Sequence, residues 1–236
     1  MTLVLDPARP YQEVCEPPLD DALRTLLREC FSAQRRAAAA RAAGDPHGGR
    51  TSRAVSPEAL AEILASGTRV AGIATEREIA SAVPFNVRNV VDVVRDRGVA
   101  ARRRRLDRVL EGALGAMFAS DPPPVMFPSG HWWYPPGTHL GWHTNERFPG
   151  WRLYLSYAEQ PGESFFRFRD PRTGRVETSL DGRWHVRLFE VSVERPLWHA
   201  VASDTHRFSV GWIVRPWSLQ DAAVRVAKRV LAPLGG

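Results

Sequence analysis

The chain has 236 residues, of which 44% are apolar and 25% charged, and its formal net charge is +6. These values are ordinary for a globular protein with one large domain, and no apolar run is long enough to span a bilayer. The N-terminus lacks the basic segment of a secretory signal. Cys15 and Cys30 stand outside any metal-binding spacing, so we expect reduced thiols in a cytoplasmic protein.

The positive charge of the chain is almost entirely arginine, since Lys228 is the only lysine. Together with abundant Ala, Gly and Pro, this skew is typical of a GC-rich bacterial genome rather than of a nucleic-acid-binding surface. The run 102–105 is interpreted as a solvated helix face, with phosphate or acidic-partner binding as the alternative. Any cation that binds a carboxylate in a pocket is expected to be an arginine.

The first half of the chain predicts helices. Apolar residues recur at helical spacing from Leu23 to Phe31, behind a cap at Asp20 or Asp21. A second helix is expected after Ser56, with Pro57 in its first turn. Further helical signals are a capping box at Thr75 and Glu78, the apolar positions of 87–94, and those of 106–117 before three prolines.

After residue 124 the pattern changes to short segments rich in Trp, Tyr, Phe and Val, separated by Pro-Gly and Asp-Gly turns. The expected strands are 130–134, 138–143, 152–157, 164–169, 187–191 and 207–214. So many short strands favour a sandwich or barrel. The predicted organisation is a mainly helical region, 1–120, packed on a β core, 121–217, followed by a C-terminal helix in 218–236, all in one compact unit.

The β region contains residues that can bind a metal. In a strand, His143 and Asn145 would project from the same face, and His199 lies on a separate segment that a sandwich can bring to them. Two imidazoles and one oxygen leave three positions of an octahedral iron open for a chelating 2-oxo acid and dioxygen. Arg207 offers a planar fork for a distant carboxylate, and Ser209 would face the same side.

These segments resemble the iron(II)/2-oxoglutarate oxygenases of the prolyl-hydroxylase kind, whose core is a double-stranded β-helix (a jelly roll). The similar stretches are Tyr134-Pro-Pro-Gly before Gly141-Trp-His-Thr-Asn, Arg152-Leu-Tyr-Leu-Ser-Tyr, Gly162-Glu-Ser-Phe-Phe, and Trp198-His through Arg207-Phe-Ser-Val-Gly-Trp. The resemblance covers about residues 124–216. It implies an α+β protein with a jelly-roll core.

The resemblance also implies roles for individual residues. His143, Asn145 and His199 would bind iron(II), and Arg207, Ser209, Tyr154 and Tyr134 would bind 2-oxoglutarate. Dioxygen would convert 2-oxoglutarate to succinate while a C–H bond of a small-molecule substrate is oxidised, by default to an alcohol. Residues expected near the substrate are His131, His139, Trp142 and Trp151.

Asn145 departs from the family pattern, which has Asp or Glu at this position. The amide oxygen can ligate iron as a weaker, neutral donor. Alternatively, a water or a halide takes its place, although Asn is nearly as large as Asp, so hydroxylation ranks above halogenation. A third interpretation is a jelly-roll binding protein that has lost its redox chemistry. A nucleic-acid-modifying oxygenase rests only on the basic charge.

Overall fold

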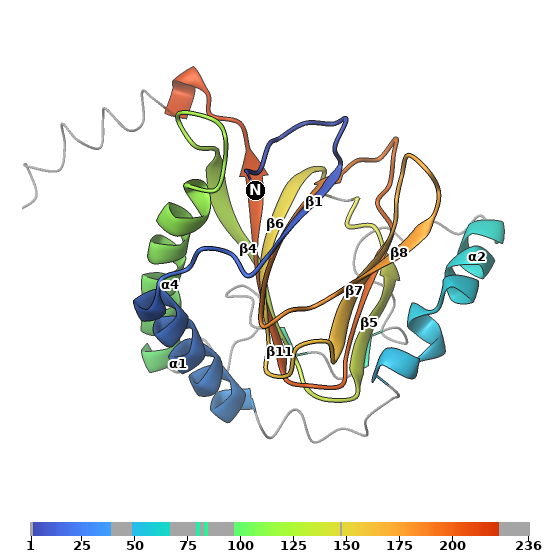
Figure 1. Ribbon diagram of the computed structural model, residues 1–236, viewed down its shortest axis with the longest axis horizontal. Coiled ribbons are helices and arrows are strands. Elements are labelled where there is room, and N and C mark those ends of the chain that lie inside the picture. Colours follow the sequence, from blue (N-terminus) through green and yellow to red (C-terminus); the bar gives the residue numbers. More distant parts are fainter. Residues whose placement is uncertain are drawn as a thin grey trace, which may run out of the picture.

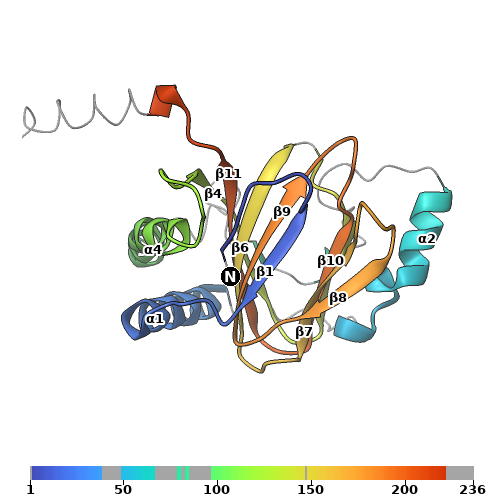
Figure 2. The same cartoon turned by 45° about the horizontal axis from the view of Figure 1, so that its top comes forward.

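The computed structural model describes residues 2–38, 49–66, 79–80, 83–84, 97–146 and 148–221. Two antiparallel sheets face each other, and helices cover their outer faces (Figures 1 and 2). The helices α1 (Asp21–Ala38) and α4 (Arg97–Gly115) lie on the larger sheet. The helix α2 (Pro57–Ala65), preceded by the 3-10 turns η2 (Gly49–Thr51) and η3 (Arg53–Val55), lies on the smaller one.

The strand pairing is that of a jelly roll. The larger sheet has the order β1 (Tyr11–Cys15), β9 (Trp184–Val191), β6 (Gly150–Ala158), β11 (Arg207–Arg215), β4 (Val125–Tyr134) and β3 (Val83–Pro84). The smaller sheet has the order β2 (Ile79–Ala80), β5 (Thr138–His143), β10 (His199–Ser203), β7 (Ser164–Arg169) and β8 (Val176–Leu180). The pairs β4–β11, β5–β10, β6–β9 and β7–β8 are nested in the sequence. This nesting confirms the predicted α+β fold with a double-stranded β-helix core.

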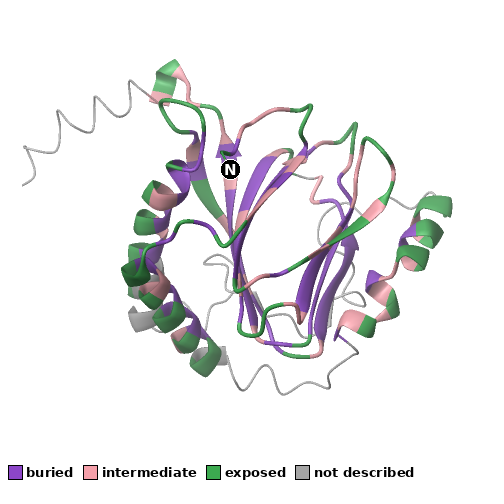
Figure 3. Ribbon diagram, viewed as in Figure 1, coloured by how far each residue is buried: buried purple, intermediate pink, exposed green. Residues whose placement is uncertain are grey.

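Alternation along each strand separates an outer face from the space between the sheets. In β6, Leu153 and Leu155 pack with the core that contains α1 and α4, whereas Tyr154 packs with the cluster between the sheets. Arg152 and Ser156 share the face of Tyr154 because side chains two residues apart point the same way. Both faces of these strands are buried (Figure 3).

Local signals predicted the starts of α1 and α2 correctly. The Asp20 carboxylate accepts a hydrogen bond from the Leu23 backbone N–H at 2.7 Å, and the Ser56 hydroxyl caps α2 by accepting from Ala59 at 3.2 Å. The helix α4 begins earlier than the expected 106. The capping box at Thr75, the helical pattern of 87–94 and the part of the C-terminal helix beyond 221 lie outside the described residues.

Five strands were not predicted: β1, β2, β3, β8 and β10. The segments of β1 and β8 carry polar residues at the edges of their sheets, and β10 contains two alanines, which have a low intrinsic preference for strands. Because β1 joins the larger sheet, the N-terminal region is not wholly helical and also supplies part of the β core. Of the helices in the described ranges, none is both long and apolar enough to cross a membrane.

Candidate functional site

Two histidines meet at one end of the space between the sheets. His143 is the last residue of β5 and His199 is the first of β10, and the antiparallel register places them directly opposite each other. Their ring centroids are 4.0 Å apart, and both residues are buried. The nested strand pairing therefore brings together two residues that are far apart in the sequence.

Each imidazole is held by a backbone carbonyl. His143 Nδ1 lies 2.8 Å from the Gly141 oxygen, and His199 Nδ1 lies 2.9 Å from the Leu197 oxygen. A carbonyl oxygen can only accept, so both Nδ1 atoms carry the hydrogen and both Nε2 atoms keep a lone pair. Burial lowers the pKa of His143 to about 4. Burial, and then the neighbouring His143, lowers the pKa of His199 well below its ordinary value. Both rings are thus in the neutral form that binds metals.

Asn145 reaches this pair by a turn, which corrects the expectation that it would share a strand with His143. The strand β5 ends at His143, and Asn145 has a φ of 59°, in the left-handed region that Asn tolerates better than most residues. Its side-chain nitrogen lies 3.1 Å from His199 Nε2. Since His199 Nε2 is an acceptor, the Asn145 nitrogen donates to it here, and a flip of the amide would turn the oxygen towards a metal ion bound between them.

The 3.1 Å between the Asn145 side-chain nitrogen and His199 Nε2 suits two ligands of one metal ion as well as a direct hydrogen bond. Two ligands at about 2.1 Å from an octahedral ion and at right angles are about 3 Å apart. The residue types also fit a divalent metal, except for the missing carboxylate. In the described ranges, no Asp or Glu carboxylate forms a close group with His143 and His199, and the half-buried Glu146 does not join them.

Aromatic rings enclose His199. Phe166 stacks on the imidazole with a centroid distance of 5.3 Å, and Phe189 lies 5.1 Å away at a tilt. Both belong to the apolar cluster between the sheets. These rings restrict the orientation of the imidazole and keep water from its sides.

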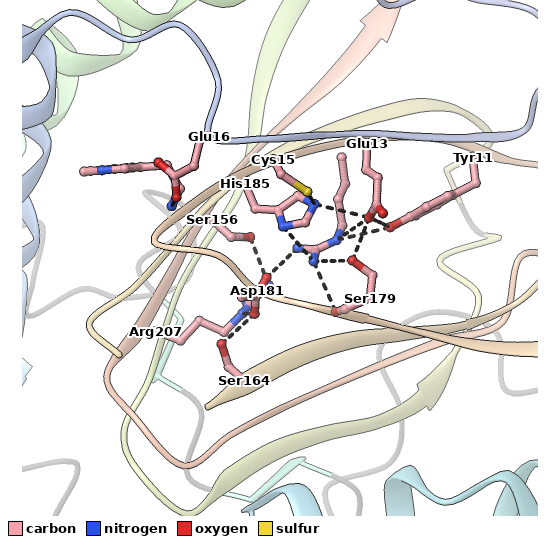
Figure 4. Close-up of polar contacts among 12 residues, drawn as sticks. Tyr11, Glu13, Cys15, Glu16, Ser156, Ser164, Ser179, Asp181, His185 and Arg207 are labelled. Carbon is pink, nitrogen blue, oxygen red and sulfur yellow. Dashed lines mark hydrogen bonds and ion pairs between the residues drawn. The ribbon is translucent and has the colours of Figure 1, made fainter. Parts of the chain in front are cut away.

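Arg207 is buried near the opposite end of β10, and its position differs from the free fork that we expected. Its Nε donates to Asp181 Oδ2 at 2.8 Å, and its Nη2 donates to the Ser156 hydroxyl at 2.9 Å. Asp181 also accepts from Arg187 Nη1 at 2.6 Å and from the Ser164 hydroxyl at 2.6 Å (Figure 4). One edge of the Arg207 guanidinium is therefore occupied by groups of the protein itself.

The other edge of Arg207 remains available. Its Nη1 is buried and has no hydrogen-bond partner in the described structure. An unsatisfied buried donor costs about 1–3 kcal/mol, so this atom fits an acceptor supplied by a ligand. The ring of Tyr134 lies 5.0 Å from the guanidinium carbon, and Ser209 follows two residues later on the same face. Burial raises the pKa of both Tyr134 and Tyr154, so these hydroxyls stay protonated.

A second polar cluster joins β1 to β9. Glu13, Cys15 and His185 place their ligand atoms within 4.8 Å of one another (Figure 4). However, Arg187 Nη2 lies 3.3 Å from His185 Nδ1, and a guanidinium can only donate. His185 Nδ1 is therefore the acceptor, and Nε2 carries a hydrogen directed at Glu13, 3.2 Å away. This tautomer describes a hydrogen-bonded structural cluster rather than a metal site.

The residues expected near the substrate lie elsewhere. His131 packs against Phe31 and Gln34 beneath α1, and Trp151 belongs to the same outer core. His139 contacts Ser52, and the Trp142 indole donates to the Ser56 carbonyl, both on the outer face of the smaller sheet. The structure does not bring these four residues to the His143–His199 pair. Alternation turns His131, Trp142 and Trp151 outward, and the β-bulge that shifts the β5–β10 register between His199 and Val201 turns His139 outward as well.

Sequence reasoning missed Asp181 and Arg187, and it considered Arg152 only through the resemblance of its strand to one in which an Arg or Tyr lines the cosubstrate pocket. Asp181 stands in an Asp-Gly turn, which predicts a solvated residue, yet it is buried. Arg152 and Arg187 occupy alternating positions of strands whose other face is apolar. The available signal was that an arginine at such an inward position needs a partner.

No protein-family model matches this chain, and no curated protein matches it in sequence. Solved structures with a similar arrangement include a prolyl-4-hydroxylase of Pseudomonas putida, at 15% identity and a TM-score of 0.42, covering 87% of this chain and 93% of the other. A prolyl hydroxylase of Trichoplax adhaerens, in complex with a hypoxia inducible factor peptide fragment, has 10% identity and a TM-score of 0.43, with coverages of 88% and 84%.

A third similar structure is an oxidoreductase of the 2OG-Fe(II) oxygenase family from Burkholderia pseudomallei. It has 13% identity and a TM-score of 0.34, and the match covers 78% of this chain and 88% of the other. These likenesses are too distant to support a conclusion about chemistry. The nested strand pairing establishes the fold.

Proposed function

We propose that this protein is a non-haem iron(II)- and 2-oxoglutarate-dependent oxygenase that oxidises, most simply by hydroxylation, a C–H bond of a small molecule. The His143–His199 pair carries this proposal: two neutral, buried imidazoles whose Nδ1 atoms are held by carbonyls and whose Nε2 atoms keep the lone pair that a metal ion needs. Asn145 would complete the group as a neutral oxygen ligand. When bound, iron(II) and 2-oxoglutarate would supply the oxidising chemistry with dioxygen.

The residues around the pair have separate tasks. Arg207 would donate from Nη1 to the distal carboxylate of 2-oxoglutarate, while Asp181 and Ser156 hold the guanidinium in place. Tyr134, Tyr154 and Ser209 would add neutral hydroxyl donors along the cosubstrate. Phe166 and Phe189 would limit the access of water to His199. Because only Nη1 of Arg207 can donate to 2-oxoglutarate, we expect weaker cosubstrate binding than a guanidinium that donates from two nitrogens would give.

The test is an anaerobic titration of the purified chain with iron(II) and 2-oxoglutarate, followed by the visible charge-transfer absorption of the chelate. We expect the band in the wild type and in His206→Ala, whose half-buried ring lies against Trp133 on the outer side. The band should be lost in His143→Ala and in His199→Ala with the fold intact. A wild-type protein that binds iron but gives no band, or a band that persists in both variants, would contradict the proposal.

A second function is favoured by one observation, the amide at the carboxylate position. Because no acidic side chain in the described ranges joins His143 and His199, the same residues would also suit a jelly-roll binding protein without redox chemistry. Such a protein would neither require iron(II) nor consume 2-oxoglutarate. An oxygenase should consume 2-oxoglutarate slowly even without its substrate, so an assay for succinate separates the two functions.

A further inference from the structure

Arg152 is a buried cation beside the histidine pair. It lies on the inner face of β6, together with Tyr154 and Ser156, and is 4% exposed. The register of the larger sheet pairs it with Phe189, whose ring touches that of His199. Arg152 therefore lies at the level of the histidine pair in the space between the sheets, whereas Arg207 lies near its other end.

No acidic side chain in the described ranges neutralises Arg152. Its Nη1 donates to the Trp151 carbonyl at 3.2 Å, and its Nη2 donates to the Phe148 carbonyl. The other two arginines that face the interior, Arg187 and Arg207, share the carboxylate of Asp181. Backbone carbonyls bear only partial charges, and burial lowers the pKa of Arg152. A buried guanidinium without a counter-ion is costly unless a ligand supplies the charge.

The groups around Arg152 increase this imbalance. Asn145 is neutral where a carboxylate would have contributed a negative charge, and each histidine keeps an unprotonated Nε2 because its Nδ1 donates to a carbonyl. The Phe148 backbone, which Arg152 holds by its carbonyl, in turn donates to the Asn145 carbonyl at 3.1 Å. Arg152 thus braces the loop that carries Asn145 and leaves this end of the site with a net positive charge.

We infer that Arg152 binds the carboxylate of an anionic substrate at the level of His143 and His199. The substrate class is a small carboxylic acid with an apolar body, because Phe189 and Val191 line the same space. As an assignment of substrate class, this inference rests on the proposed oxygenase function. The inference assigns the two carboxylates to different arginines: Arg207 binds that of the cosubstrate, and Arg152 binds that of the substrate.

The test measures binding by the intact chain, without iron, of 3-phenylpropionate and of its uncharged analogue 3-phenylpropionamide. We expect the acid to bind at least tenfold more tightly than the amide. Arg152→Gln should remove this difference, and Arg152→Lys, which keeps the charge, should retain part of it. The matched control is Arg167→Gln on the outer face of β7, where the guanidinium also donates to a carbonyl and a hydroxyl oxygen; it should change nothing.

The second arm distinguishes a substrate carboxylate from that of the cosubstrate. Arg207→Gln should weaken 2-oxoglutarate binding and leave 3-phenylpropionate binding unchanged, and Arg152→Gln should do the reverse. Equal affinity for acid and amide, or an Arg152→Gln variant that loses only 2-oxoglutarate, would overturn the inference. Its failure is separable from that of the oxygenase proposal, since the chelate band requires iron and this preference for acids does not.

Discussion

At the scale of single residues, the site depends on hydrogen bonds that fix tautomers. Gly141 and Leu197 lie two residues before their histidines, and their carbonyls leave both Nε2 atoms unprotonated. In the proposed metal site, Asn145 would bind the ion less strongly than a carboxylate, because a carboxylate adds a negative charge and an amide does not. The same reasoning about tautomers argues against a metal at Glu13, Cys15 and His185.

Replacing Asn145 with Asp should raise the affinity for iron(II), or for manganese(II) as its redox-stable substitute, by at least tenfold. The physical reason is that an anionic carboxylate replaces a neutral amide, whose nitrogen lies 3.1 Å from His199 Nε2. Calorimetric titration measures the change, with Asn145→Ala as the variant expected to bind more weakly than wild type. An unchanged affinity in Asn145→Asp would place this side chain outside the metal site.

The stability of the metal-free protein should fall as the pH drops from about 6.5 towards 4. Burial lowers the pKa of His143 from 6.5 to about 4, so in this window the unfolded chain binds a proton that the folded chain does not. The stabilisation is complete above pH 6.5 and loses roughly 3 kcal/mol at His143 below pH 4. Urea unfolding at several pH values should show a shallower dependence in His143→Gln; an identical slope would refute the assignment.

At the scale of elements, close approach between β6 and β11 positions Tyr154. Gly211 pairs with Tyr154 in the register, and a Cβ at Gly211 would lie 2.1 Å from the Tyr154 ring. The glycine therefore allows the ring to lie across β11. The position of the Tyr154 hydroxyl, which we propose as a donor to 2-oxoglutarate, depends on this contact.

Gly211→Ala should destabilise the fold by roughly 2–3 kcal/mol, because the ring of Tyr154 must move within a packed interior. Gly112→Ala is the matched control: it lies in α4 with no atom within 4 Å of the added Cβ, and it should stabilise by about 1 kcal/mol. Thermal unfolding of both variants measures the contrast. Equal effects would mean that Tyr154 does not occupy this space.

At the scale of the whole molecule, Asp181 joins parts of both sheets. It lies between β8 and β9 and binds Ser164 of β7, Arg187 of β9 and Arg207 of β11 (Figure 4). Burial alone raises the pKa of Asp181, but the charges of Arg207 and Arg187 outweigh this effect and hold the pKa below its ordinary value. The carboxylate therefore stays ionised until strongly acidic pH, and its contribution to stability is lost only there.

Asp181→Ala should cost about 3–5 kcal/mol of unfolding free energy, since it leaves two buried guanidinium groups without a counter-ion. The control is Asp204→Ala, which removes a carboxylate paired with the partly exposed Arg50 and should cost no more than about 1 kcal/mol. Urea denaturation at neutral pH compares the two. Similar losses would show that the buried network contributes no more than a surface ion pair.

The sequence alone determined the features that depend on neighbouring residues. The caps at Asp20 and Ser56 and the strands 138–143 and 164–169 follow from spacing and alternation, which local sterics and hydrogen bonds enforce. Only the tertiary structure decided which side chains meet. Nested pairing placed His143 opposite His199. It also placed Asp181 beside Arg207 and left Arg152 without an acidic partner in the described ranges. It also turned Trp142 and Trp151 outward. These outcomes depend on the register between strands far apart in the chain, and no local pattern encodes that register.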